Sequence, residues 1–301
     1  MRSFNILDIP AALRNAQHVL CFDMERVFLH NVVNPSGDFL KNCFLTRDCS
    51  LSLHTLNPDW EGFAQLQIGR ASGNLLYASS MQDENFPMLI EDLCVTTGEM
   101  GKAHILANVP AESDQFNLLK RSGFSSYSQQ ALWKMKHSQP ADKSNIEWRF
   151  EDSQDQPVIR FFYTKNISPL ETSFQTWSFA DTFHLIQQDH SQKICAVARV
   201  RFYMDRAVVL PMLDIQQGDP APWLDSLFSE LSQFFSTIFV RVPVRHDVYH
   251  KFLSERAQII LPENHWLVRN LVNLSKVWEL QSSEFRDERS IPRPTTPCTK
   301  S

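Results

Sequence analysis

Glycine is scarce in this sequence, with 8 residues among 301. Loops that hold a phosphate against backbone N–H groups depend on glycine, because a side chain keeps the phosphate away from the amides. Long apolar runs are missing too: none approaches the roughly 20 residues that cross a bilayer. The first residues lack the apolar segment of a secretory signal peptide. We therefore expect a cytoplasmic protein with no membrane partner.

Blocks of like charge are also missing, and the net charge is −5. Binding to nucleic acid needs a concentrated basic surface, so we expect no nucleic-acid partner. The six cysteines show no CxxC pair and no regular spacing. This argues against a zinc site or a disulfide framework, and we expect no metal cofactor.

Material for hydrophobic cores is ample, with 43% hydrophobic residues and 22 phenylalanines. A length of 301 residues favours two domains. The polar segment 138–145 contains Pro140 and is predicted to link an N-terminal domain, 1–137, to a C-terminal domain, 146–280. Residues 281–301 are polar and carry three prolines, which predicts a disordered tail.

Hydrophobic periodicity predicts the same order of elements in both halves: strand, strand, helix, strand, helix, strand. In the first half these are strands 63–68 and 75–79, a helix over 86–97 ended by Gly98, strand 103–109, a helix capped by Ser113, and strand 127–135. In the second half they are strands 194–203 and 206–213, a helix over 224–235, strand 237–242, a helix over 248–253, and strand 266–271.

The two halves also match in phase. Phe116 lies six residues after Pro110, and Tyr249 lies six residues after Pro243. This agreement favours a duplicated unit. The sequence therefore predicts an α+β fold of two tandem domains, each a mixed, mostly antiparallel sheet flanked by helices.

The stretch from Ala107 to Met135, with Gly123 and Phe124 between its helix and its last strand, resembles the closing part of the GNAT (Gcn5-related N-acetyltransferase) fold. The resemblance covers about residues 40–136 and 146–272. It implies that the fourth and fifth strands of a domain splay apart and that acetyl-CoA or another acyl-CoA binds the backbone exposed in the gap. It also implies a small-molecule amine or a peptide N-terminus as acceptor.

The family holds the pyrophosphate of CoA on a glycine-containing loop before the central helix. In the first half this loop, 80–87, has no glycine and carries Asp83 and Glu84. In the second half the loop keeps one glycine. The resemblance therefore implies cofactor-binding residues in the second half, namely Met212, Leu213, Ile215, Gln216, Gln217 and Gly218.

Many family members carry a tyrosine that protonates the departing thiolate. Leu119 stands at that position in the first half, and Leu253 lies near it in the second. Tyr249, one turn earlier, is expected to be a core aromatic, so no catalytic residue is assigned. Two functions stay open. One is an acyl-CoA-dependent N-acyltransferase, and the other is a catalytically degenerate GNAT pair that binds a ligand or a protein.

Two further patterns have competing interpretations. His246 and His250 are spaced like the histidines of a zinc-binding HExxH helix, but the phase that turns Val248 inward predicts a solvated face for them. Arg199 and Arg201 alternate along one strand. They are expected on a solvated hairpin face, with contact to a CoA phosphate or an acidic partner as the alternative.

Overall fold

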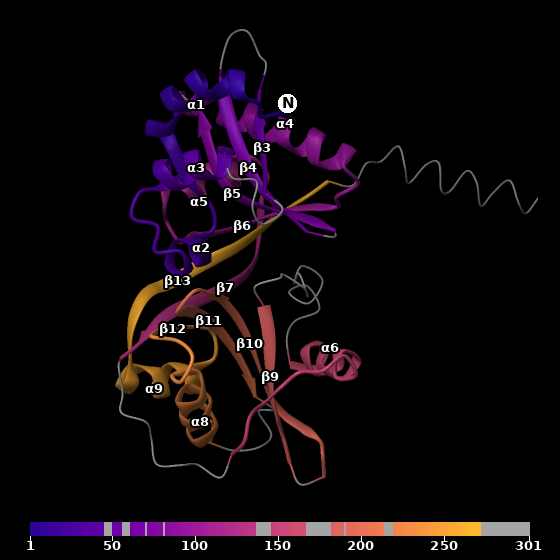
Figure 1. Cartoon of the computed structure of the whole chain (residues 1–301), viewed down its shortest axis with the longest axis vertical. Helices are drawn as coiled ribbons and strands as arrows, with labels where there is room; N and C mark the ends of the chain where they lie inside the picture. The colour runs from indigo at the N-terminus through magenta and orange to yellow at the C-terminus, as the bar shows by residue number, and fades with distance from the viewer. Residues whose placement is uncertain are drawn as a thin grey trace, which may run out of the picture.

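The computed structural model describes residues 1–44, 50–55, 61–69, 71–80, 82–136, 146–166, 182–189, 191–213 and 219–271. Within them, one 13-stranded mixed sheet runs through both halves of the chain, with helices on its faces (Figure 1). The predicted linker, 138–145, and the predicted tail, 281–301, lie outside the described residues. The domain boundaries stay a prediction.

The strands of the first half are β1 (Arg2–Ser3), β2 (Val19–Cys21), β3 (Ser50–His54), β4 (Gly62–Ile68), β5 (Ser72–Ser80), β6 (His104–Pro110) and β7 (Ser125–Met135). Those of the second half are β8 (Arg149–Phe150), β9 (Thr182–Gln188), β10 (Ile194–Tyr203), β11 (Arg206–Leu213), β12 (Thr237–Pro243) and β13 (Ala257–Asn270). The α-helices are α1 (Ile9–Asn15), α2 (Met24–Leu29), α3 (Pro35–Phe44), α4 (Phe86–Glu99), α5 (Asp114–Arg121), α6 (Gln156–Asn166), α8 (Ala221–Leu231) and α9 (Asp247–Arg256).

The closing strands of the two halves are exchanged. The order through the centre of the sheet is β6-β13-β7-β12. The last strand of the second half, β13, therefore pairs with β6 of the first half, and β7 pairs with β12 of the second. β13 and β7 also pair with each other, antiparallel. The two sheets expected from the sequence are thus fused into one, and neither half completes its sheet alone.

Helices cover both faces of each half. In the first half, α4 and α5 bury Leu89 and Leu119 against β4, β5 and β6. In the second half, α8 and α9 cover one face. The other face packs against α6 through Ile159 and Tyr163. Helix α2 of the first half lies where the halves meet, because its Leu29 packs against residues of β7, β11 and β12.

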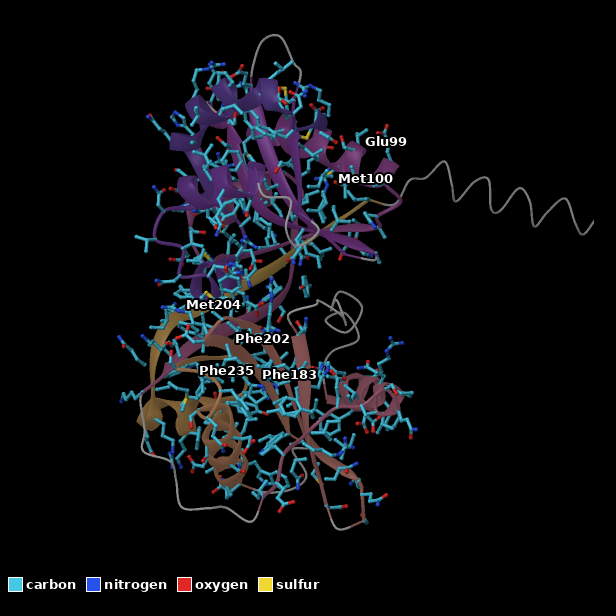
Figure 2. All side chains as sticks on the ribbon, viewed as in Figure 1. Glu99, Met100, Phe183, Phe202, Met204 and Phe235 are labelled. Carbon is cyan, nitrogen blue, oxygen red and sulfur yellow. The ribbon has the colours of Figure 1, made fainter. Side chains whose placement is uncertain are left out.

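Phenylalanines contribute to the core of the second half. The rings of Phe183 and Phe202 lie 5.7 Å apart, and those of Phe202 and Phe235 lie 6.0 Å apart (Figure 2). Such offset aromatic contacts stabilise a core beyond the area they bury. The predicted helix over 224–235 is too long, since α8 ends at Leu231 and Phe234 is 54% exposed.

The end of helix α4 differs from the prediction. Gly98 lies within the helix, and Gly101 adopts the left-handed conformation beyond it, with φ of 75°. The N–H of Lys102 then bonds to the carbonyl of Thr97 at 3.2 Å, which satisfies a terminal carbonyl of the helix. The other glycine expected at a helix end, Gly123, has φ of 77° as the prediction requires. Its α-hydrogen faces the guanidinium of Arg269 on β13, so an added Cβ would overlap that group.

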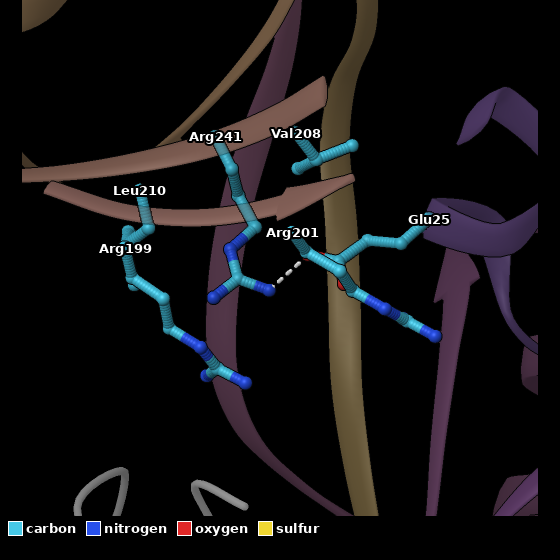
Figure 3. A pocket seen from close by; sticks show the side chains of 6 residues that line it. All are labelled: Glu25, Arg199, Arg201, Val208, Leu210 and Arg241. Atoms are coloured by element: carbon cyan, nitrogen blue, oxygen red, sulfur yellow. Dashed lines mark hydrogen bonds and ion pairs between the residues drawn. The ribbon is translucent and has the colours of Figure 1, made fainter. Parts of the chain in front are cut away.

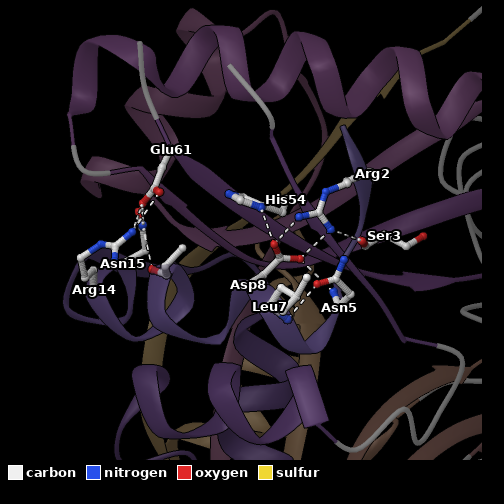
Figure 4. Close-up of polar contacts among 10 residues, drawn as sticks. Arg2, Ser3, Asn5, Leu7, Asp8, Arg14, Asn15, His54 and Glu61 are labelled. Carbon is white, nitrogen blue, oxygen red and sulfur yellow. Dashed lines mark hydrogen bonds and ion pairs between the residues drawn. The ribbon is translucent and has the colours of Figure 1, made fainter. Parts of the chain in front are cut away.

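The N-terminal segment is held to the sheet by buried and exposed ion pairs (Figure 4). The buried carboxylate of Asp8 binds the guanidinium of Arg2 and lies 3.2 Å from Nδ1 of His54 on β3. Nearer the surface, Arg14 binds Glu61 at 3.0 Å. These contacts place α1 and the residues after it against the first half of the sheet.

Candidate functional site

In each half, two parallel strands pair for a few residues and then separate. Strands β5 and β6 pair only from Ser72–His104 to Asn74–Leu106. Strands β11 and β12 pair only from Arg206–Thr237 to Val209–Val240. Beyond these pairs each strand continues with backbone groups turned toward the gap. Each gap is therefore a place where a ligand or another segment can add hydrogen bonds to the sheet.

The chain itself fills the gap of the first half. Strand β2 pairs antiparallel with Tyr77–Ser79 of β5. Beyond it, the N–H of Phe22 donates to the carbonyl of Leu76 at 2.9 Å. On the other side, the N–H of Asn108 on β6 donates to the carbonyl of Phe22 at 2.7 Å. The side chain of Phe22 is fully buried against Phe86. The backbone of both separated strands is thus already bonded to β2 and Phe22.

In the second half, a side chain reaches the corresponding gap. The N–H of Leu213 donates to the hydroxyl of Tyr249 at 3.2 Å. Tyr249 is 7% exposed, as a core aromatic should be, and burial raises the pKa of its hydroxyl to about 12. Met212 is buried against α6. The other residues predicted to bind the cofactor, Ile215, Gln216, Gln217 and Gly218, lie outside the described residues.

On the opposite face from Tyr249, arginines line a pocket beside the same gap. Its lining includes Arg199 and Arg201 of β10, Arg241 of β12 and Glu25 of α2 (Figure 3). Arg201 and Arg241 are 6% and 7% exposed. The prediction of a solvated hairpin face was therefore wrong. Alternate residues of β10 turn toward this face, where Arg201 meets Glu25 of α2 and Val197 packs against α6.

Glu25 joins the two halves electrostatically. Its carboxylate accepts from Nη1 of Arg201 at 3.3 Å and also binds Arg241. Burial alone would raise the pKa of Glu25, but the attraction of Arg241 and Arg201 outweighs it and lowers the pKa. Nearby Asp23 lies 3.7 Å from Arg201, and burial raises its pKa despite that arginine. Of these two carboxyl groups, Glu25 is therefore the one whose charged form the arginines stabilise.

Arg241 has a second neighbour and an unused donor. Its guanidinium carbon lies 4.5 Å from the centre of the Trp266 ring on β13, a cation–π contact. Its Nε–H is buried and has no acceptor among the described residues. A buried donor of a charged group without an acceptor is costly. The pocket therefore holds hydrogen-bonding capacity that Glu25 does not use.

A buried histidine lies next to Arg199. His184 on β9 is the cross-strand partner of Arg199, and its Nδ1 lies 2.9 Å from Glu151. Burial lowers the pKa of His184, although the bond to Glu151 opposes this. The ring of Tyr163 covers it edge-on at 5.8 Å. His184 thus lies beneath α6, on the face of the sheet that carries the arginines.

His246 and His250, at the start of α9, have no third metal-ligating side chain beside them among the described residues. Nε2 of His250 lies 3.2 Å from the carbonyl oxygen of Pro243, and His246 is the residue before helix α9. Val248 is 56% exposed, so its predicted inward position was wrong, whereas Phe252 and Tyr249 are buried as predicted. Across the described ranges, no group of three His, Cys, Asp or Glu side chains is placed to hold a metal.

Comparison of the whole chain with solved structures identifies its fold. A GCN5-related N-acetyltransferase from Sphaerobacter thermophilus is similar over 90% of this chain and 95% of its own, with 12% identity and a TM-score of 0.51. The fold is that of the GNAT acetyltransferases. A putative acetyltransferase from Pyrococcus horikoshii is similar over 89% of this chain and 88% of its own, with 9% identity and a TM-score of 0.51.

The likeness to GNAT proteins is one of structure. No family model and no curated protein matches the sequence. The two-domain GNAT fold predicted from the repeated order of elements is confirmed. Among the described residues, no helix is long and apolar enough to span a membrane.

Sequence reasoning missed two members of the arginine cluster. Arg241 had a visible signal, because a charge interrupts the otherwise apolar strand over 237–242. A charge in the middle of a buried strand needs a partner or a function. Glu25 had no comparable signal, since it lies in a helix of six residues whose position depends on contacts with the other half.

Proposed function

We propose that this chain is an N-acyltransferase with a single acyl-CoA site, located in the gap between β11 and β12. The observation that carries this proposal is the difference between the two gaps. In the first half, β2 and Phe22 bond to both separated strands. In the second half, no described strand lies between β11 and β12; side chains of α9 reach only the ends of these strands, the Tyr249 hydroxyl at Leu213 and the His250 ring at Pro243.

In this proposal the pantetheine arm lies along Met212 to Ile215, and the pyrophosphate lies near Gln216 to Gly218. Backbone N–H groups of β11 are then available to stabilise negative charge that develops on the thioester carbonyl. The acceptor is an amine of a small molecule or of a peptide N-terminus. It approaches the carbonyl from the face that carries the arginine pocket.

Calorimetric titration of the whole chain with acetyl-CoA and with longer acyl-CoAs tests the proposal through its stoichiometry. We expect one molecule bound per chain. Two molecules per chain would contradict the role assigned to β2, and no heat at millimolar ligand would overturn the proposal.

A pair of matched substitutions assigns the site to one half. Gly218→Asp places a carboxylate in the loop of the second half, where repulsion of the pyrophosphate should weaken binding at least about tenfold. Gln82→Asp places a carboxylate in the loop of the first half and should leave affinity unchanged. Equal effects of the two substitutions would contradict a site confined to the second half.

A second function is favoured by the contacts of Tyr249 and Glu25. The hydroxyl of Tyr249 occupies the N–H of Leu213, and Glu25 is bound by two arginines rather than held as a free base. These contacts suit a catalytically degenerate GNAT pair that binds a ligand or protein partner. Mass spectrometry of amines and peptides incubated with acetyl-CoA separates the two functions, because the degenerate pair would yield no acylated product.

A further inference from the structure

The end of the gap where β11 and β12 begin to separate has a charged residue beside it. Strand β12 pairs with β11 as far as Val240, which lies opposite Val209. The next residue on each strand, Arg241 on β12 and Leu210 on β11, lines the arginine pocket (Figure 3). A ligand that reaches this end of the gap therefore comes next to the side chain of Arg241.

Arg241 is oriented by two neighbours and has an unused donor. Its guanidinium binds the carboxylate of Glu25 through Nη1, and the guanidinium carbon lies 4.5 Å from the centre of the Trp266 ring. The edge away from Glu25 carries Nε and Nη2, which donate in one plane (Figure 3). The Nε–H is buried and has no acceptor among the described residues. A donor fixed in this way needs little reorganisation to bind an oxygen atom.

The size of the arginine pocket limits what can bind there. It has room for about one water-sized group. A single carbonyl oxygen suits such a space if the rest of the ligand lies in the gap between the strands. Arg201, which also lines the pocket, donates to Glu25 and Gln67 on the side of the first half. Arg241 is the residue that keeps a buried donor for this oxygen.

The first half has no charge at the corresponding position. Strand β6 ends at Pro110 and has Asn108 two residues earlier. Strand β12 ends at Pro243 and has Arg241 two residues earlier. The chain itself uses Asn108, since the N–H of this residue donates to the carbonyl of Phe22 at 2.7 Å. The cation thus occurs in the half where no described strand fills the gap.

The proposed position of acyl-CoA brings its reacting end to Arg241. With the pyrophosphate near Gln216 to Gly218 and the pantetheine arm along Met212 to Ile215, the arm runs back along β11 toward Leu210. Its acyl end then lies where the strands separate. We propose that Arg241 is a catalytic residue that donates to the thioester carbonyl oxygen and stabilises the oxyanion formed from it. This inference rests on the proposed function, because it requires acyl-CoA in this gap.

The role of Arg241 follows from the movement of electrons in acyl transfer. The amine nitrogen forms a bond to the thioester carbon, and the π electrons of the C=O bond move to the oxygen. The Nε–H of Arg241 and a backbone N–H of β11 stabilise this oxyanion. The C=O bond then re-forms, and the C–S bond breaks with its electron pair on sulfur. The proton that the amine nitrogen loses balances the thiolate, so the products are an amide and CoA.

The test compares two ligands by calorimetric titration of the whole chain. Acetyl-CoA has the carbonyl oxygen, and S-ethyl-CoA is a thioether that lacks it. Arg241→Lys keeps a positive charge for Glu25 but removes the edge that carries Nε and Nη2. We expect this variant to bind acetyl-CoA about tenfold more weakly, the value of one charged hydrogen bond. Its affinity for S-ethyl-CoA should stay within about twofold of wild type, since no oxygen contacts the pocket.

Arg256→Lys is the matched control. Arg256 also binds a carboxylate, that of Asp225 at 3.0 Å, and its guanidinium carbon lies 4.3 Å from the centre of the Phe252 ring. It is not part of the pocket lining, so this variant should keep both affinities within about twofold of wild type. Thermal melts show whether each variant is folded.

Infrared spectroscopy gives a second readout that does not depend on a folded variant. Acetyl-CoA labelled with a heavy isotope at the carbonyl carbon is bound to the wild-type chain. We expect its C=O stretch at a lower frequency than in water, because a charged donor polarises the bond more strongly than water does. A stretch at or above the frequency in water would overturn the role of Arg241.

The outcomes separate this inference from the proposed function. Equal losses of acetyl-CoA and S-ethyl-CoA in Arg241→Lys, or equal effects of Arg241→Lys and Arg256→Lys, would overturn the role of Arg241. The acyl-CoA site itself would stand in both cases, because both ligands bind. If neither ligand binds the wild-type chain, the proposed function falls and the role of Arg241 falls with it.

Discussion

Removing the negative charge of Glu25 should destabilise the protein more than any single surface substitution. Glu25→Gln leaves Arg201 and Arg241 buried without the carboxylate that both of them bind. Breaking a buried ion pair from one side costs about 3–5 kcal/mol in free energy of unfolding. The pocket is partly open to solvent, which favours the lower end, about 3 kcal/mol. Urea denaturation followed by circular dichroism measures the change as a lower transition midpoint.

An exposed ion pair supplies the control. Glu61→Gln breaks the bond to Arg14, where both side chains are about a third exposed or more, and should cost less than about 1 kcal/mol. The double variant Glu25→Gln/Arg241→Met also removes the cation of β12 that Glu25 binds and should recover part of the loss. A loss in Glu25→Gln no larger than that in Glu61→Gln would refute the view that this cluster is desolvated.

Glu25→Gln also tests how the free energy of unfolding depends on pH. The folded pKa of Glu25 lies below the usual value of 4.5. Its contribution to stability is therefore complete above about pH 4.5 and is lost as the pH falls through the folded pKa. The stability difference between wild type and Glu25→Gln should narrow in that acid range. A stability difference that widens as the pH falls through this range would contradict a lowered pKa of Glu25.

Four other changes test the fold. Gly123→Ala should cost about 1–3 kcal/mol, because alanine is strained at positive φ and its Cβ meets a guanidinium. Gly98→Ala should instead stabilise by about 0.5–1 kcal/mol, since the position is helical with open space around it; parallel urea denaturation should show opposite signs. Ser113→Ala removes the Oγ that accepts from the first turn of α5 and should cost about 1 kcal/mol in the same assay. A chain ending at Arg256 lacks β13 and should lose cooperative unfolding in both halves, which hydrogen exchange of β6 would report; protection of β6 at the wild-type level would contradict the exchanged pairing.

Sequence patterns predicted the elements that are long and regular. Strands 194–203 and 206–213 match β10 and β11 at both ends, because each is an extended, largely apolar run on either side of a tight turn. The helices of the first 44 residues were not predicted. α1 and α2 have seven and six residues, too few to establish a helical period.

The exchanged strands could not be read from the sequence. Only 266–271 was predicted of β13, because Pro262 and its charged neighbour Glu263 interrupt the apolar pattern before it. The structure accommodates this stretch with register shifts against β7 between Leu261 and Asn264. Which strand a segment pairs with depends on long-range contacts, and neither propensity nor periodicity records them. For the same reason, the sequence did not predict that Arg201 contacts Glu25 and Gln67.

The exchange of closing strands sets the order of events during synthesis. Asn264 on β13 pairs with Pro110 on β6, so the sheet of the first half lacks a central strand until β13, which ends at Asn270, has been made. At the usual translation rates of about 5–20 residues per second, the roughly 130 residues after β7 take about 6–26 s to add. During that interval β6 presents an unpaired edge, which is a template for pairing with another nascent chain. Folding of the first half therefore requires that β13 of the same chain pairs with β6 before a strand of another nascent chain does.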